Sequence, residues 1–393
     1  MTVLIAPDKF KGSLTAGQVV DALCRGLAAR GIASRGLPLA DGGDGNVQAA
    51  LHAGFMPMEI SVTGPTGKPH QAIFATCGST AVVEVANTCG LSVLPGGALA
   101  PLEASSRGVG EAMMAALGMG STRIVLALGG SASTDGGAGM LTALGVVFRD
   151  RNGHTVDVDG GSLRQIHSID RSGLIDLRHV EIIIASDVEN PLTGPVGAAS
   201  VYRPQKGAIP ADVKDLDAGL TNLVHRLVAA GWGDAAALAD APGAGSAGGL
   251  GFAGLLLGGR LVSGADFFLD LLEFDTHVRG CDLVITGEGK LDSQTLAGKL
   301  LAIVARRSGT LPVVAVVGHS QVDAERSPYR REVSTTQRSQ QAPHRTDLAS
   351  HGYGHPTAQV LPRCSRSPGV EPGRRASVHR PALVVPGDRD HGA

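Results

Sequence analysis

The stretch RIVLALGGSASTDGGAGM, residues 123–140, joins a short apolar run to a loop of Gly, Ser, Thr and Asp. The same order is found in VLIAPDKFKGS (3–13), VEIIIASDVENP (180–191) and DLVITGEGKLD (282–292). A short apolar run bounded by turn residues is typical of a buried strand. The sequence therefore predicts an α/β protein whose polar loops gather at the carboxyl ends of the strands, where such sheets place their sites.

Two segments predict local structure in more detail. Val19, Val20, Leu23 and Leu27 recur at helical spacing, with Ser13 or Thr15 as the candidate N-cap and Gly31 at the C-terminal end. The segment ISVTGPTGKPHQAIFAT (60–76) has turn dipeptides between β-branched runs, which predicts a hairpin, and a third strand is expected at 81–84.

The composition excludes several classes of protein. Of the 393 residues, 43% are hydrophobic and 3% aromatic, and the formal net charge is −2. Neither a stacking surface for nucleic acid nor a general attraction to DNA or membranes is expected from these values. The N-terminal apolar run meets charge at once, which indicates a strand rather than a signal peptide, and no run of ~20 apolar residues is present to span a membrane. Five scattered cysteines without a C-x-x-C pair are compatible with the cytoplasm; the oligomeric state is left open.

Carboxylates and lysines recur in the loops that follow the predicted strands. The candidate catalytic residues are Asp8, Lys9, Asp41, Asp44 and Asp187. A carboxylate in such a loop can take a proton from a substrate hydroxyl or hold a metal ion, and a lysine can bind a phosphate. Alternatives remain open, because Asp44 could cap the next helix, and Asp8 with Lys9 could be ordinary surface charge.

The segment ITGEGKLDSQT (285–295) combines glycines, whose backbone a ligand can approach closely, with carboxylates and a lysine. Glu288 and Asp292 are hard oxygen ligands of the kind that Mg²⁺ takes, and Lys290 suits a phosphate. A helix beginning at Ser293 would favour an anion near its N-terminus. The alternative is a strand–turn–helix junction that Asp292 or Ser293 caps.

Two further loops add phosphate-binding candidates, and familiar motifs are absent. The loop 129–137 offers Ser131, Thr134 and Asp135 between glycines, and PQKGA (204–208) adds a lysine. There is no Walker sequence and no G-x-S-x-G, and GAGSAG (243–248) matches the dinucleotide fingerprint without its preceding strand. These loops together indicate Mg²⁺-dependent phosphoryl transfer, because that reaction depends on positioning and charge neutralisation. They supply several carboxylates, several lysines and glycine-rich backbone that can bind an anion.

Taken together, the loops resemble those of the bacterial glycerate kinase family, which converts glycerate to 2-phosphoglycerate. The resemblance rests on APDKFKGSLTA (6–16), DGGDG (41–45), VTGPTGKP (62–69), GGSASTDGGAGM (129–140), SDVENPLTGPVGA (186–198), PQKGA, GAGSAGGLG (243–251) and DLVITGEGKLDSQTLAGK (282–299). It implies a glycerate kinase fold, with a Rossmann-like parallel-sheet domain, a second α/β domain and the active site between them. It also implies ATP and Mg²⁺ as cofactors and glycerate as the small-molecule substrate.

The resemblance also implies the residues of the site. Our assignment gives Asp187 the role of base or metal carboxylate, places Glu288 and Asp292 near Mg²⁺, and sets Lys9 on an anionic group. Arg107 is a candidate for the substrate carboxylate. The full set of candidate binding residues is Gly42, Gly43, Arg107, Gly130, Ser131, Thr134, Asp135, Asn190, Lys206, Gly245, Gly248, Gly287, Gly289, Lys290, Ser293 and Thr295.

The C-terminal part of the chain departs from the family pattern. The family-like region is expected to cover residues 1–323 as two α/β subdomains, with the second inserted from about 62 to 264. Residues 324–393 are rich in Arg, Pro and His, without Phe, Ile, Met or Trp, and are expected to be disordered. A change of reading frame near Asp323 would explain the shift and could impair activity. A kinase of another small hydroxy acid and a non-catalytic binding remnant remain the alternative functions.

Overall fold

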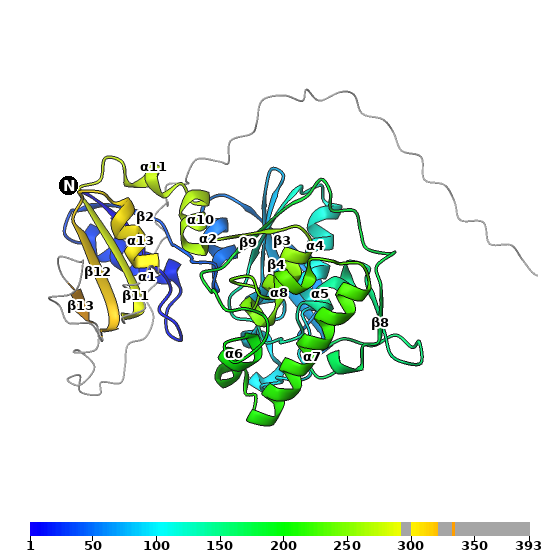
Figure 1. The fold of residues 1–393 in the computed structure, drawn as a ribbon. Helices are drawn as coiled ribbons and strands as arrows, with labels where there is room; N and C mark the ends of the chain where they lie inside the picture. Colours follow the sequence, from blue (N-terminus) through cyan, green and yellow to red (C-terminus); the bar gives the residue numbers. More distant parts are fainter. Residues whose placement is uncertain (292–299, 321–331, 335–393) are drawn as a thin grey trace, which may run out of the picture.

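The computed structural model describes residues 1–291, 300–320 and 332–334, and over these residues the protein has the predicted α/β architecture (Figure 1). Two large sheets form its core, one of five strands and one of six. A further pair of short strands, β7 (Val147–Arg149) and β8 (Ser168–Asp170), lies beside the second sheet. Among the described residues, no helix is both long and apolar enough to cross a membrane.

The first sheet is parallel throughout and has the strand order β13-β12-β11-β1-β2. Its strands are β1 (Thr2–Ile5), β2 (Ala33–Gly36), β11 (Leu283–Leu291), β12 (Val313–Ser320) and β13 (Glu332–Ser334). The central pairing joins residues far apart in the sequence, because Val3 lies opposite Leu283. The N-terminal and C-terminal parts of the described chain therefore build one sheet together.

Helices cover both faces of this first sheet. On one face, Val20 of α1 (Ala16–Ala28) packs against Val3 and Ile5. On the other face, Leu4 and Val284 belong to a core that includes α10 (Gly264–Leu271), α11 (Phe274–Val278) and α13 (Leu300–Arg307). Cover on both faces explains why these strands are continuous apolar runs in the sequence.

The second sheet has the order β10-β9-β6-β5-β4-β3 and is mixed. Its strands are β3 (Met56–Thr63), β4 (Pro69–Cys77), β5 (Thr80–Glu84), β6 (Arg123–Ala127), β9 (Glu181–Ala185) and β10 (Arg260–Val262). The predicted hairpin is confirmed, because β3 and β4 pair in antiparallel register, and the predicted third strand is β5. Strands β5, β6, β9 and β10 then continue as parallel neighbours.

Helices α4 (Arg107–Gly118), α5 (Ala138–Ala143), α7 (Pro210–Ala229) and α9 (Leu250–Leu256) pack their apolar residues into the largest core, on one face of the second sheet. The remaining helical segments are α3 (Val85–Thr88), α6 (Ala198–Lys206), α8 (Ala235–Ala239) and the short turns Leu91–Val93, Pro95–Gly97, Leu163–Gln165 and Ser246–Gly248. Helix α1 begins as predicted, since Thr15 accepts a hydrogen bond from the amide of Gln18.

Two helices connect the sheets. In α2 (Asn46–His52), Ala49 packs into the core of the first sheet, and Val47 and Ala50 pack against the second. Helix α10 does the same with Leu269 and Phe268, and both helices lie between the sheets in Figure 1. These shared helices fix the loops at the strand ends of one sheet against those of the other.

The closest approach between the two sets of loops is made of backbone alone. The amide of Gly129 donates to the carbonyl of Gly42 at 2.9 Å. A Cβ on Gly129 would lie 2.2 Å from the Cα of Gly43, and one on Gly264 would lie 2.2 Å from the carbonyl oxygen of Asp41. Glycine is required at these positions because a side chain would push the loops apart.

Candidate active site

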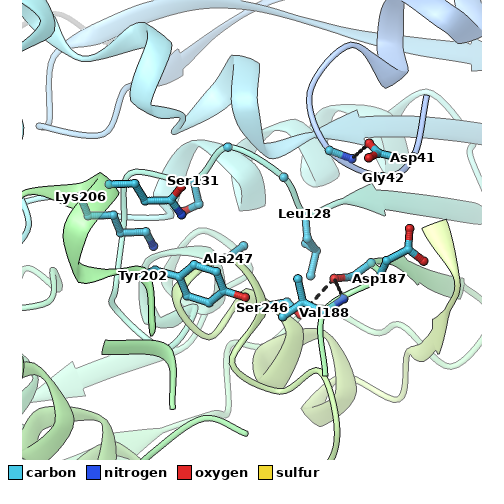
Figure 2. Close-up of a pocket in the computed structure, with 15 residues that line it drawn as sticks. Asp41, Gly42, Leu128, Ser131, Asp187, Val188, Tyr202, Lys206, Ser246 and Ala247 are labelled. Atoms are coloured by element: carbon cyan, nitrogen blue, oxygen red, sulfur yellow. Dashed lines mark hydrogen bonds between the residues drawn. The ribbon is translucent and has the colours of Figure 1, made fainter. Parts of the chain in front are cut away.

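A cavity of ≈ 270 Å³ lies where the loops of the two sheets meet (Figure 2). Its wall contains much bare backbone and several hydroxyls, and one lysine extends into it. The lining residues are Asp41, Gly42, Gly43, Leu128, Gly129, Gly130, Ser131, Ser186, Asp187, Val188, Tyr202, Gln205, Lys206, Ser246 and Ala247. Eight of the predicted site residues therefore surround one cavity: Asp41, Gly42, Gly43, Gly130, Ser131, Asp187 and Lys206 line it, and Gly245 directly precedes the lining segment 246–247.

Lys9 is the centre of a cluster of carboxylates at the edge of this cavity. Its Nζ lies 3.2 Å from Asp44, 3.6 Å from Asp8 and 3.9 Å from Asp41. These negative charges raise the pKa of Lys9 even though burial opposes the charge. Burial, with the nearby charge of Asp41, raises the pKa of Asp8 to about 7. Four predicted catalytic residues thus form one cluster around Lys9, and the surface-charge alternative for Asp8 and Lys9 is wrong because both side chains are largely buried.

Asp44 is not the cap of α2, contrary to the alternative left open above. The cap residue is Gly45, with φ +96°, and it makes no side-chain cap hydrogen bond. The carboxylate that serves this helix is Glu84, at the end of β5, which accepts from the amides of Gly45 and Val47, both at 2.8 Å. Burial raises the pKa of Glu84. The sequence signal for this role was an acid at the end of an apolar strand, and it was not recognised.

Asp187 performs a similar task for α10, the other connecting helix. Its carboxylate accepts hydrogen bonds from the Ser263 hydroxyl and the Gly264 amide, both at 2.9 Å, and from the Ala265 amide at 3.3 Å. Burial and the nearby charge of Asp41 raise its pKa, although the Ser263 hydrogen bond opposes this. Asp187 therefore lines the cavity, as predicted, and also holds the helix N-terminus, which was not predicted.

Asp135 is completely buried and faces away from the cavity. It accepts from the amide and the hydroxyl of Ser106, both at 2.7 Å, and from the amides of Gly137 and Gly139 at 3.1 Å. Burial raises its pKa. These four hydrogen bonds bind the N-terminal ends of α4 and α5 together, so Asp135 serves the ends of these two helices and does not line the cavity.

Lys206 is the lysine that extends into the cavity (Figure 2). It is 3% exposed, and its Nζ donates to the carbonyl of Ser133 and, at 3.4 Å, to the hydroxyl of Thr134. Burial lowers the pKa of Lys206 to about 8. Thr134 itself is buried behind the cavity wall, where it helps to hold the lysine.

The loop 243–249 packs against the loop that carries these groups. A Cβ on Gly245 would lie 2.2 Å from the carbonyl oxygen of Pro191, and one on Gly248 would lie 2.0 Å from that of Ser133. Asn190 lies behind Tyr202, donating to the carbonyl of Val196 at 2.9 Å and accepting from the Tyr202 hydroxyl at 3.3 Å. These residues shape the wall, and nothing in the sequence marked Tyr202 as part of it.

Arg107 is not brought to this cavity. It pairs with Glu111 at 3.0 Å and lines a separate cavity with Thr63 and Asp159. The structure therefore places this predicted residue with a different group of side chains.

The β11 segment reaches the carboxylate cluster with Glu288, whose charge contributes to the raised pKa of Asp8. A Cβ on Gly287 would lie 2.2 Å from the carbonyl oxygen of Val316, and one on Gly289 would lie 3.1 Å from the amide nitrogen of Lys11, so both glycines serve close backbone packing. Lys290 is exposed. The predicted residues Asp292, Ser293 and Thr295 lie outside the described residues.

The carboxylate cluster suits a hard divalent cation. Asp41 and Glu288 raise the pKa of Asp8 through their negative charges, so a cation near these groups would be stabilised. Within the described part of the chain, no three His, Cys, Asp or Glu side chains are arranged to hold a metal by themselves. Mg²⁺ commonly uses one or two carboxylates and completes its shell with water and substrate phosphates, so this donor set fits it.

Comparison with known proteins identifies the family of this chain. The family model described as the glycerate kinase family matches residues 3–354. The chain is 43% identical to a glycerate kinase from Bacillus subtilis (strain 168), over 82% of this chain and 86% of the relative. It is 40% identical to a glycerate 2-kinase from Escherichia coli (strain K12), over 81% and 85%. A crystal structure assigned as a glycerate kinase 2 from Salmonella typhimurium LT2 superposes with a TM-score of 0.72 at 37% identity, covering 85% of this chain and 90% of the other. On this similarity in sequence and fold, the chain belongs to the glycerate kinase family.

Proposed function

We propose that this protein transfers a phosphoryl group from ATP to glycerate, forming 2-phosphoglycerate. The observation that carries the proposal is the group formed by Lys9, Asp8, Asp41 and Asp44 at the edge of a glycine-lined cavity. Phosphoryl transfer requires positioned cations and carboxylates together with backbone that can approach phosphate closely. The names of the relatives support glycerate as the acceptor.

Two lysines would neutralise the anionic groups of the reactants. Lys9 lies among the carboxylates at the edge of the cavity, where a bound phosphate would compete for its charge, and Lys206 lines the cavity itself. Gly42, Gly43 and Gly130 leave this part of the wall without Cβ atoms, so a phosphate can approach the backbone closely, although the amides of Gly42 and Gly43 already donate to Asn46 and Asp41. The cavity can therefore hold a phosphate and a small carboxylate near each other.

Asp187 is our candidate for the base that takes the proton of the glycerate hydroxyl. It lines the cavity, and burial with the nearby charge of Asp41 raises its pKa, which makes the carboxylate a stronger base. Three hydrogen bonds fix its position. Glu288 and Asp292 would hold Mg²⁺, which supplies neutralisation of charge on the transferring phosphoryl group.

A coupled assay of ADP release, with and without glycerate, tests the proposal. We expect release that requires glycerate and Mg²⁺, stops in EDTA and yields 2-phosphoglycerate by ³¹P NMR. ADP release only in the presence of a different hydroxy acid would show that this acid, and not glycerate, is the substrate. Binding of nucleotide without any release would make the protein a non-catalytic remnant, and full activity in excess EDTA would contradict the metal dependence. The proposed setting is the cytoplasm, with no nucleic acid or membrane as partner.

A further inference from the structure

A second cavity, of ≈ 240 Å³, lies next to the carboxylate cluster on the side away from the first cavity. The loop Asp41–Gly45 separates the two, because Asp41 to Gly43 line the first cavity, and Asp44 and Gly45 line the second. Lys9 and Asp8 also line the second cavity. The same charged group is therefore accessible from both sides.

The walls of the second cavity are largely apolar. Helix α1 contributes Ala16 and Gly17, the segment after β2 contributes Pro38 and Leu39, and α2 contributes Ala49. Leu39 and Ala49 are each 2% exposed and belong to the core of the first sheet, so this wall is rigid. A cavity of this size between apolar walls suits an apolar ring system better than a small anion.

Polar groups stand at the edge of this space. The Nδ1 of His52 lies 2.8 Å from the carbonyl oxygen of Gln48. Because a carbonyl oxygen only accepts, Nδ1 carries the proton, and Nε2 of the neutral ring is left as an acceptor. An amino group on a heterocyclic ring, such as that of adenine, could donate to it. Gln48 and Thr15 offer further hydrogen-bonding groups along the same edge.

The volumes of the two cavities indicate how a nucleotide would lie. At ≈ 270 and ≈ 240 Å³, each is smaller than the ~300–1,000 Å³ typical of sites for drug-sized ligands. A nucleoside triphosphate that delivers its terminal phosphoryl group to the first cavity must therefore extend beyond it. The second cavity is adjacent to the first, and its lining includes Lys9 and Asp44 of the carboxylate cluster.

We propose that the second cavity holds the adenosine end of the phosphoryl donor, with the phosphate chain passing Lys9 to reach the glycine-lined cavity. The proposal rests on the proposed function. The first cavity, with Lys206 and three serine residues, receives the anionic groups. The second has Lys9 at its edge as its only lysine and receives the base.

Gly17 offers a direct test, because it is a bare position on the cavity wall within α1. A Cβ there would lie 3.5 Å from the His52 ring, so a leucine would extend into the space proposed for the base. Gly26, on the same helix, has nothing within 4 Å of its Cβ position and provides a matched control. Leucine is favoured over glycine within a helix, so both variants should fold.

Calorimetric titration of the full-length variants with ADP and, separately, with glycerate measures the effect. We expect Gly17→Leu to weaken ADP binding at least ~10-fold, a change of about 1.4 kcal/mol, while glycerate binding changes less than ~2-fold. Gly26→Leu should leave both unchanged. His52→Ala, which removes the acceptor without adding bulk, should weaken ADP binding by a smaller factor, and it tests the same point if Gly17→Leu does not fold.

Unchanged ADP binding in both Gly17→Leu and His52→Ala overturns the inference, and so does a loss of glycerate binding in place of ADP binding. Adenosine alone should compete with ADP in the wild-type protein, and failure to compete also overturns it. If Gly17→Leu weakens ADP binding but the wild-type protein never phosphorylates glycerate, the result supports this nucleoside site and contradicts the proposed function. The two failures are therefore distinguishable.

Discussion

The tripeptide Asp-Gly-Gly occurs after an apolar stretch and before a short helix at both 41–43 and 135–137. The aspartates of these two copies have opposite surroundings in the folded protein. Asp41 lines the glycine-rich cavity, accepts one hydrogen bond from the Gly43 amide and lies 3.9 Å from Lys9. Asp135 is fully buried and accepts four hydrogen bonds.

The difference comes from what covers each loop. Side chains from α7 lie over the second copy, since a Cβ on Gly136 would lie 2.5 Å from Leu223. The first copy faces the cavity and contacts other loops through glycine backbone. A carboxylate that is enclosed stabilises helix ends, whereas one that is open and next to a lysine is available to a ligand.

The largest expected effect on stability belongs to the buried copy. Asp135→Ala leaves buried donors of Ser106, Gly137 and Gly139 without an acceptor, and each can cost ~1–3 kcal/mol. We expect the free energy of unfolding, measured in urea, to fall by at least ~3 kcal/mol. Asp41→Ala serves as the matched control and should lower it by less than ~1 kcal/mol, because only the Gly43 amide loses its partner, and that amide belongs to the cavity lining, where water can replace the carboxylate. Equal losses in the two variants would remove the distinction between the copies.

Asp187 both lines the cavity and holds the N-terminus of α10, so one substitution can separate its effect on turnover from its effect on stability. The N-cap of α10 is Ser263, and asparagine at position 187 keeps one oxygen that can accept from Ser263 and Gly264. Asp187→Asn loses only the longer hydrogen bond from the Ala265 amide, so the free energy of unfolding should fall by about 1 kcal/mol. Asparagine cannot act as a base, so turnover should fall at least ~10²-fold, about 2.7 kcal/mol in the activation barrier. Steady-state kinetics and urea unfolding of the same preparation measure the two quantities. Near-normal turnover would show that Asp187 serves only to hold the N-terminus of α10.

The contact between the glycine loops is tested by Gly129→Ala. The added methyl would lie 2.2 Å from the Cα of Gly43, so the two loops must separate. Overpacking of this kind costs ~1–3 kcal/mol. We expect a matching loss in the free energy of unfolding, together with weaker glycerate binding, because the loops form one wall of the cavity. Gly118→Ala, at a helical position with open space, should lower neither quantity, because alanine is favoured over glycine in a helix. A Gly129→Ala variant that loses no more than this control would show that the contact is dispensable.

The cluster around Lys9 also predicts a dependence on pH. The pKa of Asp8 is about 7 in the folded protein and near 3.8 when unfolded, so between these values only the folded state keeps the proton. Because the folded state binds more protons there, the free energy of unfolding should fall as pH rises from about 4 to about 7, by at most ~1.4 kcal/mol per pH unit. Comparing urea unfolding of wild type and Asp8→Asn across this window checks the prediction. The variant should show a flatter profile, and identical profiles would contradict the assignment.

Much of the fold could be predicted because it depends on local patterns. The apolar runs, the hairpin at 60–76 and the cap at Thr15 are encoded in neighbouring residues, and they are confirmed. The subdomain boundaries near 62 and 264 stay a prediction; the strands of the second sheet run from Met56 to Val262. Residues Glu332–Ser334, within the segment expected to be disordered, form β13 beside β12, and the family match extends to residue 354.

The site was harder to predict, because its residues meet only after folding. Sequence identified acids and glycines at strand ends, and seven of the candidate residues line one cavity. It could not distinguish Asp41 from Asp135, since burial by α7 is a long-range effect. For the same reason it missed Glu84 as the acceptor for α2, and it drew Arg107 towards a site from which the fold separates it.

The central claim is that the cluster around Lys9 is where phosphoryl transfer takes place, and glycerate-dependent ADP release by Lys9→Met tests it most directly. Lys11→Met, two residues away at an exposed position, is the control for the loss of one positive charge. We predict a loss of turnover of at least ~10²-fold for Lys9→Met and less than ~2-fold for Lys11→Met, with both proteins folded. Wild-type turnover in Lys9→Met would contradict the account, because the lysine that lies within 4 Å of all three carboxylates would then have no part in the reaction.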